Sequence, residues 1–139
     1  MEPCRLCGSP EGIRDDAGWA CARCGWRVGA YIDPELPPPR IHVVYYLRQG
    51  DRVKIGTTFQ PRQRFAAIWH EELLAFERGD RVLERQRHDQ FADERYPGSE
   101  WFRMSRRLRR HVASIAAGID DPWAQHARWI SEAYARISH

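Results

Sequence analysis

The chain has 139 residues, of which 42% are apolar and 12% are aromatic. This composition excludes an intrinsically disordered chain, and the length allows one domain of about 100 residues with a small extra module, not two full hydrophobic cores. The formal net charge is +3, and Lys54 is the single lysine, so arginine carries almost all of the positive charge. Apolar stretches are short, and the N-terminus lacks the apolar segment of a signal peptide, so we expect a cytoplasmic protein without a membrane anchor.

The sequence begins with two CxxC pairs that are separated by thirteen residues, each followed by a glycine. The cysteines, the only ones in the chain, are Cys4, Cys7, Cys21 and Cys24. A glycine adopts the positive φ that a tight metal knuckle needs, while nearby backbone N–H groups turn toward the thiolate sulfurs. Four thiolates at this spacing indicate one tetrahedral zinc site.

The alternatives for these cysteines are a redox CxxC pair or an iron–sulfur cluster, and a reducing compartment argues against disulfides. A closed four-thiolate site has no open coordination position, so we assign the metal to folding. Arg5, Arg23 and Arg27 would give the ribbon positive charge, which Asp15 and Asp16 oppose. A DNA-contacting ribbon and a purely structural or partner-binding ribbon both remain open.

Composition changes divide the chain into four segments. We expect a zinc ribbon over residues 1–32, a proline-rich linker over 33–40, the main domain over 41–119 and an amphipathic helix over 120–139. Proline lacks a backbone donor, and the run Pro37-Pro38-Pro39 favours an extended, stiff conformation. The linker therefore marks the domain boundary.

A β-hairpin is expected directly after the linker. Strands over residues 42–48 and 52–57 flank a turn at Gly50-Asp51. If these two residues form the loop, Leu47 pairs with Lys54 and Tyr45 with Gly56. Tyr45 and Lys54 are then diagonal neighbours on one face, above a glycine that leaves the surface open. Tyr46 faces the other way.

Two helices and a third strand are expected next. Pro61 is suited to the first position of a helix that continues over residues 62–70, and residues 71–76 read as a strand. Asp80 is a suitable N-cap for a second helix. The fold class predicted for this domain is α/β of the α+β kind, with a three-stranded antiparallel sheet flanked by helices.

The second helix carries residues of two kinds. Val82, Leu83 and Phe91 are expected to face the core, whereas Glu84 and His88 lie one turn apart on a common face. A carboxylate and an imidazole on one helix face can serve a polar site, although a solvent-facing charge is the simpler interpretation for Glu84.

An arginine-rich stretch without acids follows between residues 101 and 119. Its arginines are Arg103, Arg106, Arg107, Arg109 and Arg110. Such a block can follow a polyanion, and it can equally be a solvated helix face. Residues 105–117 fit a helix that ends at Gly118, with Leu108, Val112 and Ile115 inside. The last helix is expected to pack on the main core, on the ribbon or on a second subunit.

Five motifs between residues 43 and 102, in order and spacing, resemble a GIY-YIG endonuclease domain of the phage-type T5orf172 branch. They cover about two-fifths of the chain and lie at residues 43–45, 54–56, 57–64, 83–91 and 99–102. The first two correspond to the GIY and YIG motifs, the third to the threonine and arginine stretch, the fourth to the Glu and His helix and the fifth to the closing aromatic motif. Lys54 stands where the second family tyrosine would be.

The resemblance implies a site that hydrolyses phosphodiester bonds with one divalent metal, Mg²⁺ or Mn²⁺. It implies Glu84 as the metal ligand, Arg64 on the scissile phosphate, and Tyr45 as the residue that positions or deprotonates the attacking water. We expect nearby cations to lower the pKa of Tyr45. Lys54 would bind phosphate or act on the phenol, and His88 would complete or support the site.

Glu100 is a reserve metal ligand in this interpretation. Arg62 and the arginine-rich stretch are the expected nucleic-acid contacts, while Trp101 and Phe102 are expected in the core. The sequence therefore predicts a metal-dependent DNA endonuclease with a structural zinc ribbon. The alternatives are a noncatalytic DNA-binding or regulatory module and a protein-interaction adaptor, and a homodimer through the last helix is also open.

Overall fold

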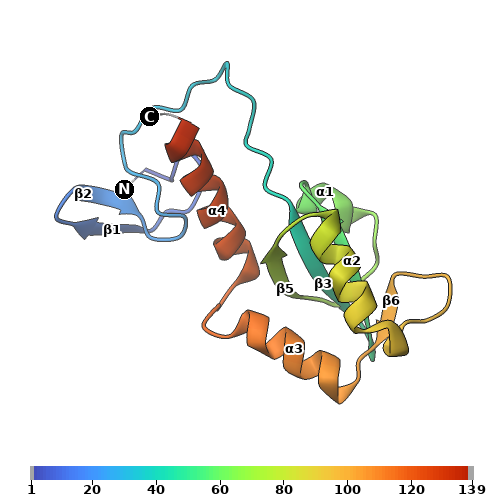
Figure 1. Cartoon of the computed structure of the whole chain (residues 1–139). Helices are drawn as coiled ribbons and strands as arrows, with labels where there is room; N and C mark the ends of the chain where they lie inside the picture. The colour runs from blue at the N-terminus through green and yellow to red at the C-terminus, as the bar shows by residue number, and fades with distance from the viewer. Residues whose placement is uncertain (1, 138–139) are drawn as a thin grey trace. The chain divides into compact units, whose positions relative to one another are not determined.

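The computed structural model describes residues 2–137, which form two compact units. Unit 1 combines the chain up to Arg40 with the segment from Trp123 onward, and unit 2 extends from Ile41 to Pro122. Residues 31–42, which include the proline-rich segment, contain neither helix nor strand, as the sequence predicts. Figure 1 shows the elements of both units in chain order.

Unit 1 is a small hairpin with one long helix packed against it. Strands β1 (Gly12–Asp15) and β2 (Gly18–Cys21) pair antiparallel, and helix α4 covers Pro122–Ile137. Ala127 and Tyr134 of α4 pack on a buried cluster that contains Trp26, whose ring meets that of Tyr134 edge to face at 6.3 Å. Of the three packing partners considered for the last helix, the structure therefore selects the ribbon.

Unit 2 is built on a four-stranded antiparallel sheet in the order β5-β3-β4-β6. The strands are β3 (Val43–Gln49), β4 (Arg52–Thr58), β5 (Glu72–Arg78) and β6 (Trp101–Arg103). The predicted α+β class is confirmed, but the sheet has four strands where the sequence predicts three. Residues 101–103 alternate too briefly to read as a strand, and only their pairing with β4 defines one.

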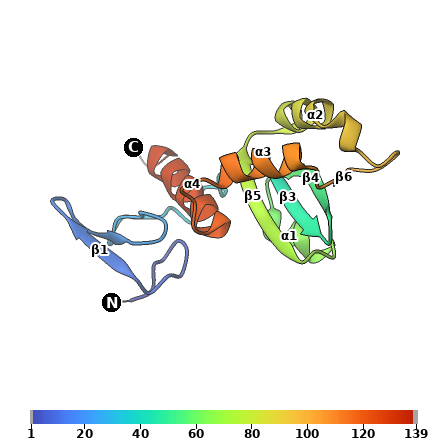
Figure 2. The same cartoon turned by 90° about the horizontal axis from the view of Figure 1, so that it is seen from below.

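Helices cover both faces of this sheet. They are α1 (Pro61–Ala66), α2 (Arg81–Gln90) and α3 (Arg106–Ala116), with a 3₁₀ turn at Ala92–Glu94. Leu83 of α2 and Leu108 of α3 pack on the sheet face that carries Tyr46, whereas Phe65 of α1 contacts Tyr45 on the opposite face. Figure 2 shows α2 and α3 on one side of the sheet and α1 on the other.

The hairpin β3–β4 has the register that the sequence predicts. Tyr45 pairs with Gly56 and Leu47 with Lys54 across a turn at Gly50, whose φ is +61°. Alternation then places Tyr46 in the main core. The register therefore fixes which side chains of β3 and β4 face the candidate site.

The helix starts are also as expected, because their caps are local. The side chain of Asp80 accepts a hydrogen bond from the N–H of Val82, and that of Ser105 accepts one from Leu108. Gly118 follows α3 with a φ of +77°. These contacts involve residues at most three positions apart, so the sequence is sufficient to predict them.

Three expectations were wrong in detail. Helix α1 ends at Ala66 instead of residue 70, and β5 extends to Arg78 instead of residue 76. Val82, expected inside, is 64% exposed. Helix α2 faces the sheet with positions 83, 84, 87, 88 and 91, a helical stripe that excludes position 82.

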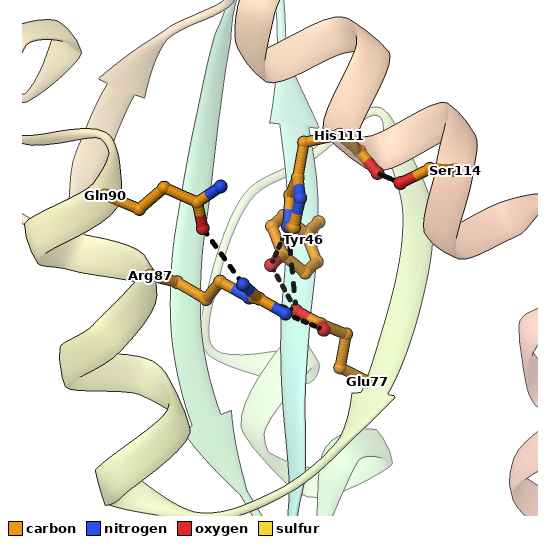
Figure 3. A network of polar contacts seen from close by, with 6 residues as sticks. All are labelled: Tyr46, Glu77, Arg87, Gln90, His111 and Ser114. Carbon is orange, nitrogen blue, oxygen red and sulfur yellow. Dashed lines mark hydrogen bonds and ion pairs between the residues drawn. The ribbon is translucent and has the colours of Figure 1, made fainter.

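A polar network joins α2 and α3 to the sheet on the Tyr46 face (Figure 3). The Tyr46 hydroxyl donates to Glu77 at 2.5 Å, and Arg87 binds the same carboxylate through Nε and Nη2 at 2.9 and 2.6 Å. The ring Nε2 of His111 lies 3.0 Å from the Tyr46 hydroxyl. One carboxylate therefore connects β3, β5, α2 and α3.

We predict that Glu77 makes the stability of the protein acid-sensitive. Burial alone would raise the pKa of Glu77, but the hydrogen bonds from its partners lower it from 4.5 to about 2. A lowered folded-state pKa stabilises the fold above pH 4.5, and this contribution, on the order of 3 kcal/mol, is lost as the pH falls toward 2. Chemical denaturation over this range should show a flatter pH dependence for Glu77→Gln than for wild type.

Glu72→Gln is the matched control for this prediction. Glu72 lies on the same strand and pairs with Arg48 at 3.2 Å, but its side chain is 56% exposed. The control should keep the wild-type slope between pH 4.5 and 2. Equal slopes for wild type and Glu77→Gln would contradict the assignment.

Candidate functional site

The structure brings the four cysteines of unit 1 together. Their sulfur atoms all lie within 4.8 Å of one another, with Cys4 and Cys24 3.8 Å apart and Cys7 and Cys21 3.5 Å apart. A zinc ion bound to four thiolates at about 2.3 Å separates the sulfurs by about 3.8 Å. The cluster therefore has the dimensions of a four-thiolate zinc site, and it is the only such group of His, Cys, Asp or Glu ligands found within residues 2–137.

The two knuckles orient backbone donors toward the sulfurs. Gly8 and Gly25 have φ values of +81° and +82°, as expected for the residue after each CxxC pair. The N–H of Leu6 lies 3.4 Å from the sulfur of Cys4, and the N–H of Cys24 lies 3.5 Å from that of Cys21. These donors stabilise thiolates, so the donor set fits a cation.

In unit 2, the ring of Tyr45 lies directly over Gly56. A Cβ atom at position 56 would lie 2.9 Å from Cε2 of the ring and would overlap the phenol oxygen. Tyr45 is 1% exposed and packs edge to face on Phe65, with ring centroids 4.9 Å apart. The sequence predicts a Gly56 that leaves the surface open. Instead, the glycine makes room for the Tyr45 phenol.

Arg64 of α1 reaches the Tyr45 phenol as a hydrogen-bond partner. It also borders a polar hollow of about 290 Å³ with Thr58, Gln60 and Gln63. Helix α1 directs this guanidinium toward the sheet because Pro61 and Phe65 are its buried residues. The guanidinium that borders this hollow therefore also interacts with a phenol from a separate element.

The expected lowering of the Tyr45 pKa is wrong. Burial is the largest influence and raises the pKa of Tyr45, and the hydrogen bond and positive charge of Arg64 oppose it only in part. The charges of Glu100 and Glu84 raise it further. Tyr45 is therefore a protonated hydrogen-bond donor near neutral pH, which suits positioning better than proton abstraction.

Helix α2 places Glu84 and His88 along the outer edge of β4. The Nε2 atom of His88 lies 2.7 Å from the carbonyl oxygen of Ile55, and the backbone N–H of Thr57 is near enough to the carboxylate of Glu84 to lower its pKa. Four residues of helix rise about 6 Å and two residues of strand about 6.6 Å, so the two spacings match. The helix side chains replace a missing strand neighbour at this edge.

Two carboxylates influence each other here. Burial raises the pKa of Glu84, and the negative charge of Glu100 raises it further, while His88 opposes the shift. The backbone carbonyl of Glu100 accepts from Ile55 at 3.1 Å, which places this residue at the same strand edge. Negative charge at Glu84 is thus under-compensated, a condition that a cation relieves.

Lys54 contacts Glu100 and Trp101, whereas the sequence predicts that it binds phosphate or acts on the Tyr45 phenol. Its ammonium group lies 3.3 Å from Glu100 and 5.7 Å from the ring centroid of Trp101. The charges that act most on the Tyr45 phenol come instead from Arg64, Glu100 and Glu84. Trp101 is partly buried and Phe102 fully buried in the core.

The arginines of α3 do not join this cluster. Arg107 is a structural residue, since it binds the Gln90 carbonyl at 2.5 Å and Glu94 at 3.1 Å and lies over the ring of Phe91. The other arginines of α3 are exposed on a helix that covers the opposite sheet face from Tyr45. Exposed Arg62 begins α1, on the Tyr45 side.

Sequence reasoning missed Arg52. Its guanidinium lies 4.6 Å from the ring centroid of Trp101, and the Arg52↔Arg103 register places it on the face of Lys54. Strand alternation places positions 52 and 54 on one face, and this was the signal that could have identified Arg52. The strand that carries Trp101, β6, was not predicted from the sequence.

Comparisons with known proteins give no assignment. No protein-family model, no curated protein and no solved structure matches this chain. Among the helices of residues 2–137, none combines the length and apolar character needed to cross a bilayer. The site must therefore be interpreted from its own chemistry.

We predict that Gly56→Ala lowers stability and displaces the phenol. Gly56 does not have a positive φ, so its backbone tolerates alanine and the cost arises from overlap with the Tyr45 ring. Overpacking of this kind costs about 1–3 kcal/mol. Chemical denaturation should show most of this loss removed in a Tyr45→Ala background. Strictly additive effects of the two substitutions would show that the ring and the glycine are not in contact.

Proposed function

We propose that this protein is a metal-dependent DNA endonuclease with a GIY-YIG-like site and a structural zinc ribbon. The observation that supports it is the convergence of the Tyr45 phenol, the Arg64 guanidinium and the Glu84 carboxylate. Arg64 of α1 and Glu84 of α2 both act on the pKa of the Tyr45 phenol of β3, Arg64 through a hydrogen bond and its positive charge and Glu84 through its negative charge. The motif resemblance found in the sequence names the same three residues independently.

The carboxylates fit a hard divalent cation. Glu84 would hold it, with Glu100 close enough for the two charges to repel each other, and Mg²⁺ keeps several waters when it has few protein ligands. When bound, such a cation polarises the phosphate and activates water. The thiolates of unit 1, being soft ligands, suit zinc instead.

The protein's own residues have separate tasks. Arg64 carries a permanent charge beside the hollow and neutralises charge that develops on phosphate oxygens, an effect typically worth about 3 kcal/mol. Tyr45, kept protonated by burial, holds the attacking water or a phosphate oxygen by a hydrogen bond. His88 fixes the position of α2 through the Ile55 carbonyl and so orients Glu84.

We predict Mg²⁺- or Mn²⁺-dependent nicking of supercoiled plasmid by the wild-type protein. Glu84→Gln should reduce the rate by at least about 100-fold, because it removes the negative charge that retains the cation while keeping the side-chain shape. Arg64→Gln should reduce it by a similar factor through the lost phosphate contact. Agarose-gel nicking rates across metal concentrations provide the measurement.

Glu72→Gln is a suitable control, since the exposed Glu72 side chain pairs with Arg48 of β3. It should nick at close to the wild-type rate at pH 7. Equal nicking by wild type and Glu84→Gln, or no nicking by wild type with either metal, would rule out the enzyme.

We also predict one zinc ion per chain, lost in Cys7→Ser. The thiolate cluster contacts Trp26, which packs against α4, so metal loss should loosen unit 1 and change tryptophan fluorescence. Elemental analysis measures the zinc. Ser9→Ala alters the same knuckle without removing a ligand and should retain the metal; equal zinc content in Cys7→Ser and wild type would contradict the site.

A second candidate function is binding without cleavage. The Lys54–Glu100 ion pair favours this candidate. Glu100 neutralises the positive charge of Lys54, which stands where the second family tyrosine would act. Such a module would bind DNA with a steep salt dependence and without a divalent metal. Absent nicking together with salt-dependent binding would favour this candidate.

A further inference from the structure

Three cations of β4 and β6 share the sheet face that carries Tyr45. The register Tyr45↔Gly56 places the side chains of positions 52 and 54 on the same face as the phenol, because strand residues alternate. Arg103 of β6 is the direct partner of Arg52, so its side chain points the same way. Arg52, Lys54 and Arg103 thus extend from the candidate site toward the β6 edge.

Two of these cations oppose each other directly. Like charges on paired residues of neighbouring strands destabilise a sheet by about 0.2–1 kcal/mol. Arg52 and Arg103 form such a pair. Within residues 2–137, the charge of Lys54 is balanced by Glu100, while no ion pair or hydrogen bond engages the guanidinium of Arg103. The surface therefore holds positive charge that the fold itself does not neutralise.

Arg52 is held in a fixed orientation on this surface. Its Nε atom donates to the side-chain oxygen of Gln49 at 2.7 Å, Nη2 donates to the same oxygen, and the guanidinium stacks on Trp101. The Nη1 group is left without a partner among the described residues. A stacked guanidinium with free donors loses little entropy when it binds phosphate.

The arginines of α3 are the competing surface, and their geometry is less suitable. Leu108 and Val112 anchor α3 to the Tyr46 face, so exposed Arg106, Arg109 and Arg110 lie on the far side of the sheet from Tyr45. A polymer bound there would be separated from the phenol by the thickness of the sheet. The surface that continues from Tyr45 and Arg64 is the one on β4 and β6.

We propose that the β4–β6 basic track, defined as Arg52, Lys54, Arg103 and Trp101, binds the phosphate backbone of the DNA strand that enters the candidate site. The four residue steps from position 52 to 56 extend about 13 Å, which corresponds to the rise of about four nucleotides of one strand along the axis of B-form DNA. The inference rests on the proposed function for the identity of the polymer. It assigns to Arg52 and Trp101 a role that the motif resemblance does not give them.

The test compares two matched charge removals in the full-length protein. Arg52→Gln/Arg103→Gln removes two charges from the track, and Arg106→Gln/Arg109→Gln removes two from α3. Fluorescence anisotropy with a labelled DNA duplex and no added divalent metal measures Kd over a salt series. The track variant should bind at least about 10-fold more weakly, with the slope of log Kd against log salt reduced by about 1.8, and the α3 variant should change Kd by less than about 3-fold.

Two outcomes would overturn the proposal. Equal or greater weakening by the α3 variant would place binding elsewhere, and no binding of DNA by wild type at low salt would remove it altogether. Arg103→Gln serves as the folding control, because removing one of two opposed charges should leave thermal stability unchanged or raised. DNA binding is measured without metal and separately from nicking. Failure of the endonuclease proposal and failure of the basic-track proposal are therefore distinguishable.

Discussion

Strand β4 needs hydrogen-bond partners beyond the three residues that β6 covers, and this requirement fixes the position of helix α2. The Glu100 carbonyl accepts from the N–H of Ile55, the His88 ring lies 2.7 Å from the Ile55 carbonyl oxygen, and Glu84 lies near enough to the N–H of Thr57 for that group to lower its pKa. An unsatisfied buried backbone group costs about 1–3 kcal/mol, so these contacts are difficult to release. The carboxylate proposed to hold a cation is thus positioned by the backbone of the sheet itself.

The two faces of the sheet have different roles because hairpin register separates them. Tyr46, one residue after Tyr45, belongs to a network in which Glu77 accepts from Tyr46 and Arg87 and in which His111 lies 3.0 Å from the Tyr46 hydroxyl. Tyr45 instead interacts with Arg64, which borders a hollow. Adjacent tyrosines therefore serve stability and the candidate site, respectively, and a shift of register by one residue would exchange them.

Much of the fold could be predicted from the sequence where the determining interaction is local. The Gly50 turn fixed the hairpin pairing, Asp80 and Ser105 fixed helix starts, and the CxxC-glycine pattern fixed the knuckles. Properties that depend on distant partners were missed. Burial under α1 determines the pKa of Tyr45, and no short pattern could show that Arg107 would bind Gln90 and Glu94.

Unit 1 is discontinuous in sequence, since it combines the chain up to Arg40 with the segment that begins at Trp123. Ribosomes synthesise proteins from the N-terminus, and domains generally fold as units during this process. All of unit 2 therefore leaves the ribosome before the helix that covers Trp26 does. The cysteine-bearing module therefore obtains its apolar cover only after unit 2 has been synthesised, and unit 2 can fold before it does.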